Sequence, residues 1–270
     1  METNSQEKNV SAAFSKQAPS FDEYDEKNPI LQWMRKRVQD HVLKIVKPNS
    51  KMLELNCGTG IDAVFFAQRG FHIHATDNAE GMLNELNKKI NTLQLQNHIS
   101  TEKISFNQLE KLSGKKYDHV FSNFGGLNCA DDLAAVIKKI IPLMNENAIA
   151  TLVIMPKICP WEIALLFKGN FKIAFRRFKK NGVASHLEGE HFKTYYYSPK
   201  FIKQAFGTSF EPVALFGLGS FCPPPYMEKF PAKFPKTFNK LLRMDARYSH
   251  NVPFRNWADH FVISLRMTRS

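Results

Sequence analysis

The amino-acid sequence predicts an α/β fold, a doubly wound, mostly parallel sheet of seven strands with a final antiparallel strand. Between residues 51 and 155, short apolar segments alternate with segments of helical periodicity, which is the pattern of βαβ units. A glycine-containing turn joins the first strand of this series to its first helix. The chain has 270 residues and is 43% hydrophobic, which suffices for one such domain with additions.

Strands and helices follow from the apolar runs and the residues that interrupt them. Gly70 stands where a left-handed cap would close a helix over residues 61–69. Other helices are expected within residues 79–95, 131–144 and 161–167. The expected strands, joined by right-handed crossovers, are residues 51–56, 71–76, 99–106, 117–122, 148–155, 210–216 and 260–267.

Three regions are expected along the chain. Residues 1–50 comprise a disordered tail, residues 1–10, and a helical lid at residues 11–46, where apolar residues recur at helical spacing. Residues 51–155 form the core, and residues 156–270 form a basic, phenylalanine-rich substrate cover that includes the last two strands. Within this cover we expect two insertions, at residues 156–208 and 217–258. The first insertion should contain a polar loop at residues 181–191.

Charge is distributed unevenly between the two halves of the chain. Residues 1–155 carry 18 basic and 18 acidic side chains, and residues 156–270 carry 19 basic and 7 acidic ones. The second half therefore holds the entire net charge of +12. Such a surface fits an anionic substrate, a membrane surface or nucleic acid, or serves only solubility.

Composition also bears on the compartment. Cys57, Cys129, Cys159 and Cys222 stand far apart, without metal-ligand or disulfide spacing, so we expect reduced thiols and no metal. The opening METNSQEKNV lacks the apolar core of a signal peptide, and no apolar run is long enough to span a bilayer. We therefore expect a soluble, cytoplasmic protein.

The strongest motif, LELNCGTG at residues 53–60, lies between the first strand and the first helix. Gly58 and Gly60 allow a sharp turn and a close approach of a ligand, and the following helix offers free N–H groups. Asp77 ends the second strand, where its carboxylate oxygens can accept both hydroxyls of an adenosine ribose. Together these features predict an adenosine-containing cofactor.

The end of the first strand indicates which cofactor this is. The turn also satisfies the loose GxGxxA pattern of dinucleotide-binding folds. Glu54 and Asn56, however, place polar groups where such folds prefer apolar residues on both faces of the strand. A buried carboxylate needs donors or a cation, and the ammonium of a methionine moiety would supply one to Glu54. This argues against NAD.

On these residues the sequence resembles the class I S-adenosylmethionine (SAM)-dependent methyltransferases, in particular their small-molecule group of ubiquinone and menaquinone type. The resemblance rests on three segments, LELNCGTG (53–60), ATDNAEGML (75–83) and YDHVFSNFGGLN (117–128). The resemblance covers residues 51–155, extends loosely to AAFSKQAPSFDEY (12–24), and has no specific counterpart after residue 156.

The resemblance implies a set of cofactor-binding residues. They are Glu54, Asn56, Gly58, Gly60, Asp77, Asn78, Met82, Asn107, Ser122 and Asn123. Met82 would form an apolar face for adenine, and Asn107 stands where the family often has an acid. Asn56 replaces the family's usual first glycine, but asparagine tolerates left-handed backbone, so the turn is expected to survive.

The substrate side is expected in the lid and in the cover. Methyl transfer from a sulfonium requires alignment and, for a protic acceptor, removal of a proton. In the family the cover is commonly built after strand five, so His191, followed by His186, is the candidate catalytic base. The expected substrate contacts are Tyr24, Phe124, Asn128 and Tyr196. The Ser-Asn-Phe-Gly sequence at residues 122–125 differs from the family's amino-methylating pattern, which favours O or C over N.

The segment at residues 171–180 combines three phenylalanines with five basic residues. It fits a lid helix packed on the core, a membrane-docking surface or, third, an RNA contact. The expected function is methyl transfer from SAM to an apolar, neutral or anionic small molecule, which releases S-adenosylhomocysteine (SAH). The alternatives are an RNA or protein methyltransferase, an NAD-linked enzyme, and a non-catalytic protein of the same fold.

Overall fold

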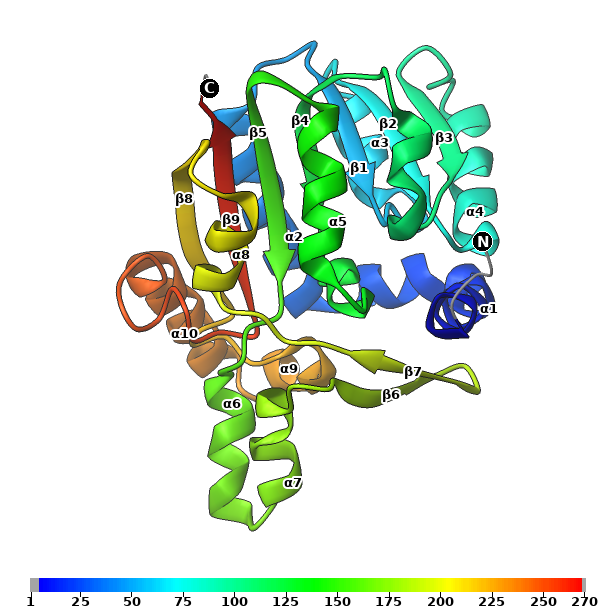
Figure 1. Ribbon diagram of the computed structural model, residues 1–270. Helices are drawn as coiled ribbons and strands as arrows, with labels where there is room; N and C mark the ends of the chain where they lie inside the picture. Colours follow the sequence, from blue (N-terminus) through cyan, green and yellow to red (C-terminus); the bar gives the residue numbers. More distant parts are fainter. Residues whose placement is uncertain (1–4, 269–270) are drawn as a thin grey trace.

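A computed structural model describes residues 5–268 and contains a seven-stranded sheet of order β3-β2-β1-β4-β5-β9-β8 (Figure 1). Strands β1 to β5 run parallel, and β9 lies antiparallel between β5 and β8. The strands are β1 (Lys51–Leu55), β2 (His72–Asp77), β3 (Ile99–Lys103), β4 (Tyr117–Ser122), β5 (Met144–Ile154), β8 (Phe210–Leu218) and β9 (His260–Met267). The predicted α/β sheet with its antiparallel final strand is confirmed.

Helices cover both faces of this sheet because the parallel strands are apolar on both sides. Met52 of β1 packs into a core with α2, α3, α4 and α10, whereas Leu53 packs into a second core with α5 and α8. These helices are α2 (Pro29–Ile45), α3 (Ile61–Ala67), α4 (Glu80–Thr92), α5 (Leu133–Ile140), α8 (Pro199–Phe206) and α10 (Pro235–Tyr248). Short 3-10 segments are η1 (Phe106–Leu112), η2 (Gly126–Cys129) and η3 (Ile141–Leu143).

The register of the central strands brings their carboxyl ends to one level. Leu55, the last residue of β1, pairs with Thr76 of β2 on one side and with Ser122 of β4 on the other. The residues that follow each strand therefore meet at one edge of the sheet. A long helix, α1 (Ser5–Lys27), lies across this edge (Figure 1).

The N-terminal lid differs from the expectation in two respects. Residues 5–10, expected to be disordered, form the first turns of α1, while residues 1–4 lie outside the described residues. The expected helical region at residues 11–46 is divided between two helices, because Asn28 caps α2 with its side-chain oxygen and Pro29 follows at the first helical position. An apolar stripe at Val10, Phe14 and Phe21 has the spacing that fixes α1 over the sheet edge.

The cover region contains a hairpin where a polar loop was expected. Strands β6 (Val183–Leu187) and β7 (Glu190–Thr194) pair antiparallel around Glu188 and Gly189. Both turn residues have positive φ, 50° and 83°, which is the geometry of a two-residue hairpin turn that matches the twist of the strands. The hairpin lies along α1 and closes one side of the lid.

The remaining additions are short helical segments. The helix expected at residues 161–167 is a turn of α6 (Pro160–Ile163) continued by η4 (Ala164–Lys168), followed by α7 (Phe171–Ala174) and η5 (Arg176–Phe178). The second insertion holds η6 (Pro225–Met227), α9 (Phe230–Lys233) and α10. Over residues 5–268, no helix has both the length and the apolarity needed to cross a membrane.

Candidate functional site

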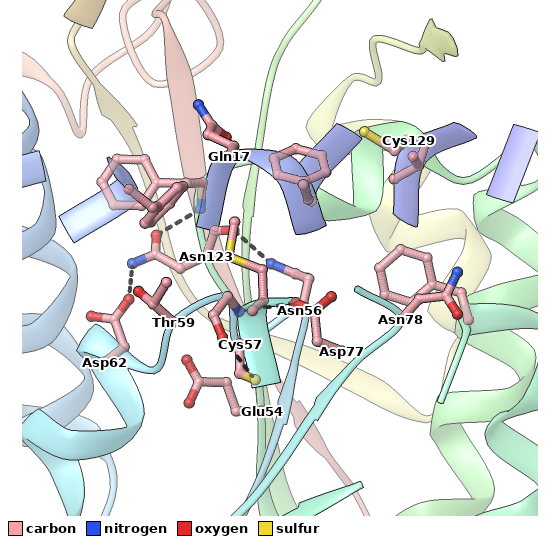
Figure 2. A pocket seen from close by; sticks show the side chains of 18 of the residues that line it. Gln17, Glu54, Asn56, Cys57, Thr59, Asp62, Asp77, Asn78, Asn123 and Cys129 are labelled. Atoms are coloured by element: carbon pink, nitrogen blue, oxygen red, sulfur yellow. Dashed lines mark hydrogen bonds between the residues drawn. The ribbon is translucent and has the colours of Figure 1, made fainter. Parts of the chain in front are cut away.

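A pocket of about 380 Å³ lies between α1 and the carboxyl ends of β1, β2 and β4 (Figure 2). Its size falls in the range of small-molecule sites, which run from roughly 300 to 1,000 Å³. The walls combine polar groups from the strand ends with apolar side chains from α1 and from the loops after β3 and β4. Ligand sites in parallel sheets form at this edge.

The turn after β1 forms one wall of the pocket. Gly58 has a φ of +56°, and a Cβ there would meet only the Met82 sulfur, at 4.0 Å, so its face opens into the pocket. Gly60 has a different role, because a Cβ there would lie 2.2 Å from Leu86 of α4. The first glycine thus leaves room for a ligand, whereas the second allows α3 to pack against α4.

Asn56 keeps the turn intact although it replaces a glycine. Its φ is +47°, in the left-handed region that asparagine tolerates. Its side chain accepts a hydrogen bond from Ser122 Oγ at 2.6 Å and donates to the Asn123 carbonyl at 3.0 Å. Asn56 therefore joins the ends of β1 and β4, and Gly126 must lack a side chain because a Cβ would overlap it.

Asp77 lies at the end of β2 and is oriented by backbone amides. Its two carboxylate oxygens accept hydrogen bonds from Gly58 N at 2.9 Å and from Ala79 N at 2.8 Å. Burial raises the pKa of Asp77, and these amides oppose that rise. Each oxygen keeps a second lone pair, so the carboxylate can accept a pair of ligand hydroxyls in the pocket.

Glu54 is a buried acid without a full set of partners. It is 2% exposed and lines the pocket, and its Oε2 atom has no hydrogen-bond partner within residues 5–268. Burial, followed by the nearby Asp62, raises the pKa of Glu54 well above its usual range, although Arg35 opposes this. An unpartnered buried acceptor is costly, so the site is suited to a ligand that brings a donor or a cation.

Arg35 of α2 ties the lid to the core beneath the pocket. Its guanidinium donates to Asp25 of α1 at 2.6 Å and also to Asp62 of α3. Asp62 in turn accepts from Asn123, at 2.9 Å. Burial opposes the charge of Arg35, but Asp62 and Asp25 outweigh it and raise the pKa of the guanidinium. The guanidinium also stacks over the Phe124 ring, 4.6 Å from its centre.

The far end of the pocket is completed by α1. Glu7 Oε1 accepts from Asn107 Nδ2 at 2.7 Å and from Ser105 Oγ at 2.9 Å. Asn78, beside them, donates to the Glu7 carbonyl at 3.4 Å, and all these residues line the pocket with Met82. Glu7 thus places a carboxylate beside Asn107, near the turn after the third strand.

The pocket includes most of the cofactor residues expected from the sequence. Glu54, Asn56, Gly58, Asp77, Asn78, Met82, Asn107 and Asn123 line it. Gly60 and Ser122 are outside the lining, because Gly60 packs on Leu86 and Ser122 donates to Asn56. These two residues stabilise the turn through contacts outside the pocket.

The expected substrate residues divide in the same way. Tyr24 and Phe124 line the pocket. Asn128 is fully buried outside the lining, where its amide bridges Met155 and the Tyr195 carbonyl. Tyr196 is also buried outside the lining, and its ring lies under the Arg177 guanidinium at 5.1 Å. Both residues hold the cover region together.

His186 and His191, the expected catalytic bases, lie away from the pocket. They face each other across the β6–β7 hairpin, with ring centres 4.7 Å apart, and both side chains are exposed. Neither belongs to the pocket lining. His260 of β9 is the histidine that does line it.

Sequence reasoning missed most of the lining residues that come from outside residues 51–155, among them Glu7, Arg35 and His260. Glu7 lies in the segment expected to be disordered, although the helical stripe from Glu7 through Val10 to Phe14 was a signal for it. Arg35 lies within the predicted lid helix, but its partners cannot be inferred from spacing. His260 begins the predicted last strand, and only the insertion of β9 between β5 and β8 brings it to the pocket.

A buried ionic cluster lies behind His260. Arg177 Nη2 donates to Glu162 Oε1 at 2.6 Å and to Asp259 Oδ1 at 3.0 Å, and Arg176 also pairs with Glu162. The Cys159 sulfur is near these carboxylates. Because arginine already neutralises both acids, the arrangement is an ion-pair network and not a metal centre.

Comparisons with known proteins agree with this geometry. A family model described as "Methyltransferase domain" matches residues 52–147, which include the turn after β1, Asp77 and Asn123. No curated protein matches the chain.

Solved structures share the fold at low sequence identity. One is a putative SAM-dependent methyltransferase from Listeria monocytogenes, 14% identical, with a TM-score of 0.59, covering 87% of this chain and 99% of that one. Another is magnesium protoporphyrin IX methyltransferase from Synechocystis PCC 6803 with bound SAH, 15% identical, with a TM-score of 0.58, covering 97% and 100%. A third is the DhpI–SAH complex, 12% identical, with a TM-score of 0.58 and full coverage of both chains.

Proposed function

The chain carries a methyltransferase domain with the class I SAM-dependent fold, and we propose that it is an enzyme that methylates an apolar small molecule at oxygen or carbon. The observation that carries this proposal is one continuous pocket with two unlike walls. One wall presents Glu54, Gly58 and Asp77, and the other presents aromatic and aliphatic side chains of α1. The first suits the cofactor and the second an apolar acceptor.

The residues of the polar wall fit SAM. The unpartnered Glu54 oxygen would accept from the ammonium, the open face of Gly58 would lie against the methionine part, and Asp77 would hold the ribose hydroxyls. Glu7 and Asn107 would contact the adenine amine, with Met82 as an apolar face. When bound, SAM supplies an electrophilic methyl group on a sulfonium. The acids around the pocket favour such a cation electrostatically.

The enclosure by α1 supports a small acceptor. Phe14, Phe21 and Tyr24 of α1 face the strand ends across the pocket. The helix is also fastened along the hairpin, where Asn9 donates to the His191 carbonyl at 2.8 Å and Lys16 pairs with Glu190. A macromolecular substrate would have to displace this lid, whereas a small molecule can be enclosed beneath it and kept from water.

The proposal can be tested with tritiated SAM and a cell extract. We expect label to enter material that partitions into organic solvent and to require the protein and an intact Asp77, with Asp77→Ala as the negative control. Label in precipitable RNA or protein would contradict the small-molecule assignment. Labelling that persists in Asp77→Ala would contradict the cofactor site.

We also propose that the cover region docks on an anionic lipid surface, which would bring an apolar acceptor to the enzyme. Helices α6 and α7 project away from the sheet (Figure 1). At their tip the side chains of Phe167 and Phe171 are 94% and 64% exposed. The same segment carries exposed cations, with Lys168 and Lys172 next to these phenylalanines in the sequence and Lys179 and Lys180 after η5. The one acid of residues 161–182, Glu162, is buried and paired, so the tip is positively charged.

Co-sedimentation with vesicles tests the docking proposal. The protein should sediment with phosphatidylglycerol-containing vesicles more than with pure phosphatidylcholine, and high salt should weaken the effect. The double variant Phe167→Ser/Phe171→Ser should bind at least about tenfold more weakly. Leu93→Ser, an exposed apolar residue at the end of α4, is the matched control. Equal binding of both variants, or retention of RNA in place of vesicles, would contradict the proposal.

A further inference from the structure

His260 lies between the pocket and the buried ion-pair network of Arg177, Glu162 and Asp259. It is the first residue of β9 and pairs with Leu218 of β8. His260 is 7% exposed, and it lines the pocket with Phe124 and Met155. The imidazole meets the edge of the Phe124 ring, with centres 6.0 Å apart and planes at 82°. It therefore faces the apolar part of the site, beside the loop after β4.

One ring nitrogen of His260 is committed to Asp259. Its Nδ1 lies 2.9 Å from Asp259 Oδ2, while Asp259 Oδ1 accepts from Arg177 Nη2 at 3.0 Å. Burial would raise the pKa of Asp259, but His260 and Arg177 outweigh it and lower that pKa to about 2. Asp259 is thus an acceptor at neutral pH and requires a proton on Nδ1. The neutral imidazole consequently carries its lone pair on Nε2.

Arg177 and Glu162 fix this acid in turn. Besides its contact with the Asp259 carboxylate, Arg177 donates to the Asp259 carbonyl at 2.9 Å and to Glu162 at 2.6 Å. All three side chains are nearly or fully buried. A network with each member satisfied is rigid, so it holds the imidazole in one orientation.

The second nitrogen, Nε2, is directed to the space beside Gly125. A Cβ at position 125 would lie 3.1 Å from Asn128 Oδ1 and 3.2 Å from both Nε2 and the Met155 methyl carbon, so these three atoms border the space that Gly125 leaves. Across residues 5–268, Nε2 makes no hydrogen bond. A base nitrogen with a fixed tautomer thus borders the apolar side of the pocket.

We propose that His260 is the catalytic base of the methyl transfer, with Asp259 as its positioning residue, and that the acceptor is an apolar phenol or enol. This inference rests on the proposed function. A histidine base matches a weakly acidic O–H, whereas a carboxylic acid is already ionised at neutral pH and needs no base. The acceptor type therefore follows from the base.

His260 Nε2 takes the hydroxyl proton, and the acceptor oxygen forms a bond to the methyl carbon as the carbon–sulfur bond breaks, its electron pair remaining on sulfur. The positive charge of the sulfonium is thereby replaced by that of the imidazolium, which Asp259 stabilises. The other charged groups that face the imidazole are Arg177 and Glu162 behind it and Arg35 across Phe124.

Nitrogen NMR tests the geometry without any turnover. In long-range ¹H–¹⁵N spectra of the SAH-bound protein at neutral pH, the signals that disappear in His260→Gln belong to His260. We expect the Nδ1–H tautomer, and a shift towards Nε2–H in Asp259→Asn, whose amide can donate to Nδ1. A wild-type His260 with its proton on Nε2 would overturn the proposal.

Kinetics and calorimetry separate this inference from the proposed function. With a phenolic acceptor, His260→Gln should lower kcat by roughly 10²–10⁴-fold, the usual worth of a general base, and leave the SAH Kd within about twofold. His72→Gln, on the exposed start of β2, is the matched control and should keep full activity. If His191→Gln loses turnover while His260→Gln does not, the base assignment is wrong. Failure of the wild type to bind SAH would contradict the proposed function instead.

Discussion

The two sides of the pocket are built in different ways. On the cofactor side, the turn after β1 and Asp77 belong to one βαβ unit, so neighbouring strand ends position them. On the acceptor side, Phe124, His260 and the side chains of α1 come from distant parts of the chain. Residues 52–147, which the family model matches, hold the first side, and the second lies largely outside them. Under the proposed function, cofactor binding depends largely on local backbone geometry, and acceptor choice depends on long-range packing.

The largest effect should come from breaking the long-range network. Arg35→Met would leave Asp25 and Asp62 buried without their cation, so we expect the free energy of unfolding to fall by about 3–5 kcal/mol. Lys36→Met, the next residue on α2, removes only an exposed pair with Asp40 and should change it by less than about 0.5 kcal/mol. Urea unfolding measures both. Equal changes would mean that α2 is not anchored by this network.

Alanine substitutions at the two glycines of the turn should have different effects on stability and on SAH binding. Gly60→Ala should destabilise the protein by about 2–4 kcal/mol, because the methyl group overlaps Leu86 and the φ of +79° is strained. Gly58→Ala meets no such overlap and should cost about 1–2 kcal/mol, yet its methyl group would fill the open face and weaken SAH binding. Thermal unfolding with and without SAH compares them. A Gly58→Ala protein with unchanged SAH affinity would exclude the turn from the site.

Glu54 should make cofactor binding depend on pH. Its pKa is raised, so the free protein keeps this group protonated to higher pH than an ordinary glutamate, whereas the ligand ammonium favours the carboxylate. Above the usual pKa of a glutamate, SAH affinity should therefore rise with pH, and binding should release protons. Glu54→Gln should weaken binding by about 1.5–3 kcal/mol, the worth of a charge-assisted hydrogen bond, and reduce the proton release.

Calorimetry in buffers of different ionisation enthalpy measures that release directly. Asp77, whose pKa is also raised by burial, leaves a residual pH dependence in the Glu54→Gln protein. A variant that binds SAH with the wild-type affinity and proton release would remove Glu54 from the cofactor site.

The smallest effect is expected at the rim of the lid. Lys16 and Glu190 form an exposed ion pair between α1 and β7. Lys16→Ala should change the free energy of unfolding by less than about 0.5 kcal/mol and speed hydrogen exchange in α1 slightly. Exchange faster by a factor of ten or more would show that this pair holds the lid closed.

How much the sequence could predict follows the same division. The alternation of strands and helices, the turn after β1 and Asp77 were predictable because glycine, strand and acid lie at fixed offsets within one supersecondary unit. Asn56 was expected to tolerate a left-handed backbone, and its φ of +47° confirms this. His191 is the candidate base from the sequence only because it lies in the cover region. No spacing in the sequence indicates that its side chain is exposed on the β6–β7 hairpin, outside the pocket lining.

The acceptor side could not be predicted because its contacts join distant residues. His260 reaches the pocket only when β9 inserts between β5 and β8, and Asp259 is held by an arginine from another insertion. On the cofactor side, Glu7 was equally hard to predict, because it requires α1 to begin before residue 11 and the helical stripe that starts it is short. Tertiary packing, and not local pattern, decides these positions.

Titration of the protein with SAH tests the central claim most directly, that one edge of the sheet holds an adenosyl cofactor between Glu54 and Asp77. Calorimetry should show one SAH bound per chain, NAD should produce no heat, and Asp77→Ala should weaken SAH binding at least about a hundredfold, as expected for two lost hydrogen bonds to a charged group. Absence of SAH binding to a folded wild-type protein, or unchanged affinity in Asp77→Ala, would contradict it.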